Sequence, residues 1–187
     1  MRWQVGVPGV AFAIALFIGG IILGFRLETS NPAHHGSAVE RLQPVGTESS
    51  GMSLGATVYV PVYSSLSLGL ERRQMVELTA TVSVRNVSSV HPIVIESVRY
   101  YDSTGKLVRQ YLDQPASLPA LGSVEFVVQR SDTAGGPGAN FLIQWKGPTA
   151  VDEPLIEAVM LGQAGNAGIS FTSAGRVLKS EAGTREP

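Results

Sequence analysis

Cysteine is absent from this chain of 187 residues. That absence excludes disulfide bridges, thiolate metal sites, cysteine nucleophiles and a lipid-modified cysteine. Histidine is scarce: His34 and His35 lie in a polar stretch, and only His91 lies among predicted strands. A Ser-His-Asp triad would need His91, yet no Gly-x-Ser-x-Gly elbow accompanies it. We therefore expect no catalytic residue, no bound metal and no cofactor.

A concentration of basic residues is also missing. All 15 acidic residues follow residue 26, together with 12 of the 14 basic residues, so this part of the chain carries a net charge of about −3. The basic residues are scattered apart from the pair Arg72 and Arg73. Nucleic-acid binding needs a basic face that neutralises phosphates. We therefore expect no nucleic-acid partner.

Long hydrophobic runs are absent with one exception, residues 5–25, which carry no charged and no hydrogen-bonding side chain. Arg2 and Arg26 flank this run. A helix of that length covers about 30 Å, the hydrocarbon thickness of a bilayer. The run is longer than the apolar region of most signal peptides, although a small-x-small pattern, Gly36-Ser37-Ala38, lies beyond it. We predict an uncleaved transmembrane anchor that contacts the lipid bilayer, with cleavage as the alternative.

Small residues recur inside this run. Ala11, Ala15 and Gly19 are spaced four apart, and Gly20 and Gly24 form a Gly-x-x-x-Gly pattern. Such spacing lets another helix approach closely, so these residues are candidates for helix packing in the membrane. The alternative is that they reflect only the ordinary composition of membrane helices.

Composition divides the chain into four parts. Residues 1–26 form the predicted anchor, and residues 27–54, rich in Ser, Gly, Pro, Thr and Glu, form a flexible linker. Residues 55–179 form the predicted β-domain, and residues 180–187 a disordered tail.

Alternation of apolar and polar residues predicts strands throughout the domain. In the clearest strand, five apolar residues alternate with five others: Val76, Leu78, Ala80, Val82 and Val84. A bulge near Glu96-Ser97 would bring Ile93 and Ile95 to the same face as Val98 and Tyr100. Pro61 predicts that the strand around 58–62 is an edge strand, and residues 155–161 predict a central strand or a short buried helix.

Seven or eight short strands with regular turns predict an all-β fold. We predict an immunoglobulin-like antiparallel β-sandwich behind one N-terminal transmembrane helix, with a small barrel as the main competitor.

The glycine-rich loop at 132–140 is the strongest candidate for a binding site. Its residues Asp132, Gly135, Gly136, Gly138 and Asn140 could either form a rigid turn or present side chains and amides to a partner. Only one carboxylate is local, which disfavours a cation site. Tyr100 and Tyr101 face opposite sides of a strand, so one of them is a candidate exposed contact; Tyr101 is our choice.

Five segments together resemble a known bacterial family. They are Gly55-Ala-Thr-Val-Tyr-Val-Pro-Val-Tyr63, Thr81-Val-Ser-Val-Arg-Asn86, Tyr100-Tyr-Asp-Ser-Thr-Gly-Lys106, Gly135-Gly-Pro-Gly-Ala-Asn-Phe141 with Trp145, and Gly168-Ile-Ser-Phe-Thr-Ser-Ala-Gly175. In this order they resemble the family known as domain of unknown function 3124. The resemblance implies an extracytoplasmic protein, often behind a signal or lipid anchor, without an assigned activity.

These observations predict a membrane-anchored, extracytoplasmic binding or interaction module that is not an enzyme. The domain would lie on the periplasmic side in a Gram-negative bacterium, with a protein partner of unknown identity. The alternative is a structural accessory subunit of a larger membrane complex, with the span packed against partner helices.

Overall fold

The computed structural model describes residues 42–45, 52–69, 75–148 and 151–181. These residues form strands, turns and bends, and no helix among them is long and apolar enough to cross a membrane. The predicted anchor at 5–25, with its helix-packing residues Ala11, Ala15, Gly19, Gly20 and Gly24, lies outside the described residues, as does the pair Arg72 and Arg73.

Twelve strands make up the described part of the chain. They are β1 (Gln43–Pro44), β2 (Leu54–Pro61), β3 (Ser65–Ser67), β4 (Met75–Arg85), β5 (Ile93–Tyr101), β6 (Leu107–Gln110), β7 (Ala116–Leu118), β8 (Ser123–Val128), β9 (Asn140–Gly147), β10 (Leu155–Ala164), β11 (Ala167–Ala174) and β12 (Arg176–Glu181).

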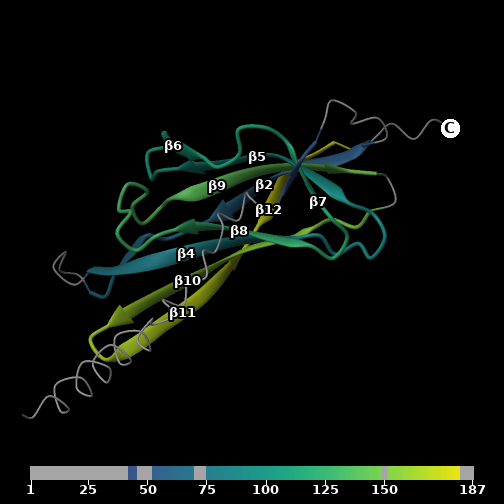
Figure 1. Cartoon of the computed structure of the whole chain (residues 1–187). Helices are drawn as coiled ribbons and strands as arrows, with labels where there is room; N and C mark the ends of the chain where they lie inside the picture. The colour runs from purple at the N-terminus through teal and green to yellow at the C-terminus, as the bar shows by residue number, and fades with distance from the viewer. Residues whose placement is uncertain (1–41, 46–51, 70–74, 149–150, 182–187) are drawn as a thin grey trace, which may run out of the picture. The chain divides into compact units, whose positions relative to one another are not determined.

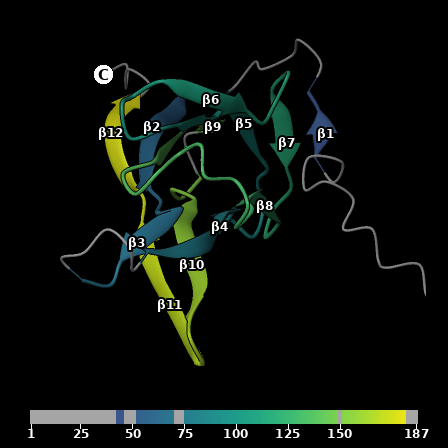
Figure 2. The ribbon, with the colours of Figure 1, turned by 90° about the vertical axis from the view of Figure 1, so that its left-hand side faces the viewer.

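The strands form two antiparallel sheets that lie one over the other (Figures 1 and 2). The larger sheet has the order β1-β7-β5-β9-β2-β12, and β6 pairs with β5 beyond the end of β7. The smaller sheet has the order β11-β10-β4-β3, and β8 pairs with β4 on the same side as β3. The described domain is therefore an all-β sandwich, as the alternating pattern predicts.

The core lies between the two sheets and follows the predicted alternation. Every second residue of β4 is buried, and the five apolar residues of that series have at most 6% of their surface exposed. In β5 the register to β9 shifts between Ile95 and Ser97. That bulge brings Val98 and Tyr100 to the same buried face as Ile93 and Ile95, which confirms the prediction.

Two predictions about strand position meet different outcomes. Residues 155–161 form part of β10, which lies between β4 and β11, so the central strand is correct and the buried helix is not. The edge position predicted from Pro61 is wrong, because β2 lies between β9 and β12. Pro61 is tolerated because it is the last residue of β2 and lies beyond Tyr59, where the pairing with β12 ends.

Part of the segment that we assigned to the linker belongs to the domain. Gln43 and Pro44 pair with Ser117 and Ala116 of β7, and Leu42 is a member of the buried core cluster. Antiparallel continuation of this register places Leu42 beside Leu118. The described chain therefore enters the sandwich next to the turn that follows β7.

The loops gather at the two ends of the sandwich. We call one the entry end: it carries the start of β2, the loop 86–92 and the turn 119–122. The opposite end carries the β5–β6 loop and the glycine-rich loop before β9, and we call it the glycine-loop end. At the entry end the buried Asn86 side chain donates hydrogen bonds to the carbonyls of His91 (2.8 Å), Leu118 (3.3 Å) and Pro119 (3.0 Å).

Candidate functional site

Two serines hold the glycine-rich loop in place. Ser103, in the β5–β6 loop, donates from its hydroxyl to the Gly135 carbonyl and accepts from the Gly138 N–H, both at 2.9 Å. The buried Ser64, between β2 and β3, donates from its hydroxyl to the Gly136 carbonyl at 2.8 Å. Loops from three parts of the sequence are thus bound together at this end of the sandwich.

Gly135 lies directly on the Tyr100 hydroxyl. A Cβ atom at Gly135 would lie 1.8 Å from Tyr100 Oη and 2.8 Å from the Ala139 Cβ. Tyr100 is fully buried, its ring lies 4.9 Å from that of Phe141, and its hydroxyl is without a hydrogen-bond partner within the described part of the chain. The close approach explains why glycine occupies this position.

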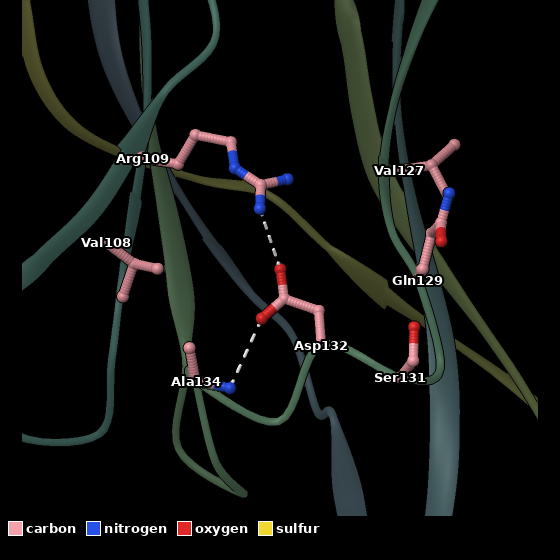
Figure 3. Close-up of a pocket in the computed structure, with 7 residues that line it drawn as sticks. All are labelled: Val108, Arg109, Val127, Gln129, Ser131, Asp132 and Ala134. Carbon is pink, nitrogen blue, oxygen red and sulfur yellow. Dashed lines mark hydrogen bonds and ion pairs between the residues drawn. The ribbon is translucent and has the colours of Figure 1, made fainter.

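Asp132 is held by two different partners. Its Oδ2 atom forms an ion pair with the Arg109 guanidinium at 3.0 Å, and its Oδ1 atom accepts a hydrogen bond from the Ala134 N–H at 3.2 Å (Figure 3). Arg109 belongs to β6, so the ion pair ties the larger sheet to the loop that follows β8. The Asp132 side chain is mostly buried, whereas that of Arg109 is about half exposed.

An open hollow of about 450 Å³ surrounds this ion pair (Figure 3). Its lining combines two residues of β6, one residue of β8 and four residues of the following loop: Val108, Arg109, Val127, Gln129, Ser131, Asp132 and Ala134. The hollow therefore presents apolar walls, two uncharged polar side chains and one pair of opposite charges.

Tyr111 packs against aromatic residues of both sheets and contacts two residues that line the hollow. Its ring packs against Phe126 and Phe141, both with centroids 5.5 Å away, and its hydroxyl donates to the Val127 carbonyl at 3.1 Å. The Arg109 guanidinium lies 5.5 Å from the centre of the same ring. Burial raises the pKa of Tyr111, and the charge of Arg109 opposes that rise. Arg109 is thus positioned by both Tyr111 and Asp132.

The β5–β6 loop is a rigid support for the serine that binds the glycines. Asp102 Oδ1 accepts hydrogen bonds from the Thr104 hydroxyl, the Thr104 N–H and the Lys106 N–H, at 2.7–2.9 Å. The Thr104 hydroxyl contributes most to a lowered pKa of the Asp102 carboxyl, followed by the Lys106 N–H. The carboxylate form is therefore the one that closes this turn.

The residues that we selected from the sequence lie in two different regions of the structure. Asp132 lies in the hollow, and Gly135, Gly136 and Gly138 contribute backbone groups to contacts with Ser64, Ser103 or Tyr100. Tyr101 and Asn140 are direct cross-strand partners of β5 and β9. Both have the parity opposite to the buried Tyr100 and Phe141, so they face outward from the larger sheet. They form a second, separate surface.

Sequence reasoning missed Arg109, Tyr111, Ser64 and Ser103. One signal was present: Arg109 has the same strand parity as Tyr111, so a charge shares a face with an aromatic residue. The partners of this face come from β8 and the loop after it, and no local pattern links segments that far apart. The two serines carry no signal, because serine is common in turns.

The arrangement suits recognition through charge and shape. The hollow offers a guanidinium to an anionic group and a carboxylate to a cationic group, in fixed relative positions. Within the described ranges, no three His, Cys, Asp or Glu side chains converge as a metal site would require.

Loss of the Asp132 carboxylate should weaken the loop slightly. We expect Asp132→Ala to lower the free energy of unfolding by about 1 kcal/mol, because a partly exposed ion pair and one loop hydrogen bond disappear. Asn140→Ala is the matched control, since no hydrogen bond of its side chain is present in the described structure, and it should change stability by less than about 0.5 kcal/mol. Urea unfolding of both variants measures the difference, and equal losses would contradict it.

The protein is a two-sheet antiparallel β-sandwich, and the hollow at one end of it is lined by β6, β8 and the loop after β8. The family whose model matches residues 55–178 is described as Protein of unknown function (DUF3124), and the chain belongs to it. The matched range begins in β2 and ends in β12, so it covers both sheets.

No curated protein matches the sequence. Among solved structures, the chain is similar to the crystal structure of Thermotoga maritima 1070, with 9% sequence identity and a TM-score of 0.39. That alignment covers 65% of this chain and 92% of the other.

Proposed function

We propose that this protein is a membrane-anchored interaction module, with an immunoglobulin-like sandwich held outside the cytoplasm and without catalytic activity. The observation that carries the binding role is the hollow between β6 and β8. Its ion pair is fixed from both sides, by Tyr111 and by the Ala134 amide, so the charges are held in place before any partner arrives. Such preorganisation lowers the entropic cost of binding.

The proposed anchor rests on the sequence. The run at 5–25 is uncharged and long enough to cross a bilayer as a helix. We propose an orientation with the N-terminus inside, which puts the sandwich on the extracytoplasmic side. The immunoglobulin-like assignment is supported by two antiparallel sheets with loops gathered at both ends.

A second candidate function is that of an accessory subunit of a membrane complex. The observation that favours it is the spacing of small residues in the apolar run, above all Gly20 and Gly24. In this case the partner would be bound by the span, not by the hollow.

One purification separates these functions. Carbonate-washed membranes should retain the full-length chain, and extraction in mild detergent should recover it with a stoichiometric partner. For an interaction module, Arg109→Ala loses the partner and Gly24→Leu retains it. For an accessory subunit the pattern is reversed. Release of the intact chain by carbonate contradicts the anchor itself, and a lone monomer from the unmodified chain contradicts both functions.

A further inference from the structure

Three apolar side chains of the loops 86–92 and 119–122 project into solvent at the entry end. Val90 is 72% exposed, Leu121 is 70% exposed and Val87 is 43% exposed. We call these three residues the apolar tip. Exposed apolar residues are unremarkable when scattered singly, but these three lie on two loops that are bound to each other.

The two loops form one unit. The Leu121 N–H donates to the Ser88 carbonyl at 3.0 Å, and the Asn86 N–H donates to the Gly122 carbonyl at 2.9 Å. The Asn86 side chain adds bonds to the carbonyls of Leu118 and Pro119, and its oxygen accepts from the Ser88 N–H at 3.0 Å. The apolar tip is therefore presented by a fixed backbone and does not depend on side chains from elsewhere.

Leu121 has a backbone conformation that its side chain does not favour. Its φ of 56° lies in the left-handed region, where glycine and asparagine are the usual residues. Burial does not compensate, since most of the leucine surface is exposed. A strained, exposed leucine contributes little to folding, so its presence points to a role at the surface.

The loops that carry the apolar tip have no charge. Residues 86–92 and 119–122 contain no Asp, Glu, Lys or Arg. These two loops therefore offer little to a partner that recognises charge, whereas the interfacial region of a bilayer accepts uncharged apolar side chains. Zwitterionic lipid is sufficient for such contact.

The chain enters the domain at this same end. Leu42 lies beside Leu118, and Leu118 precedes Leu121 by three residues. The segment before Leu42 contains the apolar run at 5–25. Sixteen residues, 26–41, separate that run from Leu42. The covalent connection thus starts from the end of the sandwich that carries the apolar tip.

We propose that the apolar tip is a membrane-docking surface: Val87, Val90 and Leu121 insert into the interfacial layer of the bilayer that anchors the chain. This inference rests on the proposed membrane anchor. Docking would direct the glycine-loop end, with its hollow, away from the bilayer and toward partners. Two contacts, the span and the apolar tip, would then set the orientation of the domain.

The absence of cysteine allows a direct test in the full-length chain. Single-cysteine variants Val90→Cys, Leu121→Cys and, as a control at the glycine-loop end, Lys106→Cys are labelled with an environment-sensitive fluorophore. Each is reconstituted into phosphatidylcholine vesicles that carry a nitroxide on the lipid acyl chains. We expect the labels at 90 and 121 to shift to shorter wavelength and to lose at least half of their emission to the nitroxide, while the label at 106 is unaffected.

The same vesicles test the membrane anchor and the docking of the apolar tip separately. Vesicle flotation reports the anchor alone: a chain that does not float contradicts the proposed function and the docking with it. A chain that floats with all three labels unquenched contradicts docking only. Labels at 90 and 121 that shift without quenching show a protein occupant and also overturn the proposal, as does quenching at 106.

Leu121→Asn provides the matched variant. Asparagine tolerates the left-handed backbone, so the folded domain should melt at the same temperature or higher. Under our proposal this variant lowers the quenching of a label at Val90→Cys by severalfold. Unchanged quenching at 90 would show that Leu121 is not part of the docking surface.

Discussion

Gly135→Ala is expected to lower the free energy of unfolding by about 3 kcal/mol. The new Cβ atom would lie 1.8 Å from Tyr100 Oη and 2.6 Å from Tyr100 Cζ, so the buried tyrosine or the loop must move. Gly138→Ala is the control within the same loop, because its nearest contact is the Ser103 hydroxyl at 3.3 Å. Urea unfolding compares the two, and similar losses would contradict the steric explanation.

The Tyr100→Phe substitution shows whether the hydroxyl is the obstacle. The Tyr100 hydroxyl is buried without a hydrogen-bond partner in the described structure, so its removal alone should be neutral or slightly stabilising. Combined with Gly135→Ala, it should recover at least about 1 kcal/mol of the loss, because the closest contact disappears. Strict additivity of the two changes would indicate that the loop and the tyrosine do not meet as described.

The raised pKa of Tyr100 predicts a loss of folding stability at alkaline pH. Burial, followed by the charge of Asp132, raises the pKa of Tyr100 from 10.0 to about 12. The unfolded chain therefore loses this proton first, and the contribution of Tyr100 to stability declines as pH rises from 10 toward 12. The Tyr100→Phe variant should lack this part of the alkaline destabilisation.

Trp145→Ala is expected to cost about 3–5 kcal/mol, enough to unfold many domains of this size. Trp145 is only 2% exposed, and its strand β9 lies between β5 and β2 in the larger sheet. Its Cα partners there are Ile95 and Ala56, both buried.

Two variants of β4 test the facing that underlies this prediction. Val82→Ala removes a side chain with no exposed surface and should cost about 1–3 kcal/mol, whereas Thr81→Ala, on the outer face, should cost under about 1 kcal/mol. Thermal and urea unfolding of the three variants give the order Trp145, Val82, Thr81. Equal losses at Val82 and Thr81 would mean that the facing is wrong.

The candidate site shows where prediction from sequence ends. Asp132 was predictable as a notable residue, because it opens a loop with three glycines and one proline. Its partner Arg109 is 23 residues away, on β6 of the larger sheet. The sequence left two interpretations of the glycines, a rigid turn or a surface for presentation. In the structure Gly135 is buried against Tyr100, and the Gly138 N–H donates to the Ser103 hydroxyl.

The periodic properties of this protein could be predicted from its residues alone. Alternation decided which face of β4 is buried, and a parity change decided where β5 bulges, because both depend only on neighbouring residues in an extended chain. Family membership also followed from the order of short segments. The tertiary structure alone decided that β2 is an inner strand, that Arg109 meets Asp132, and that Leu121 lies beside Ser88. These facts depend on strand order and on contacts between distant loops, and local propensity carries no information about either.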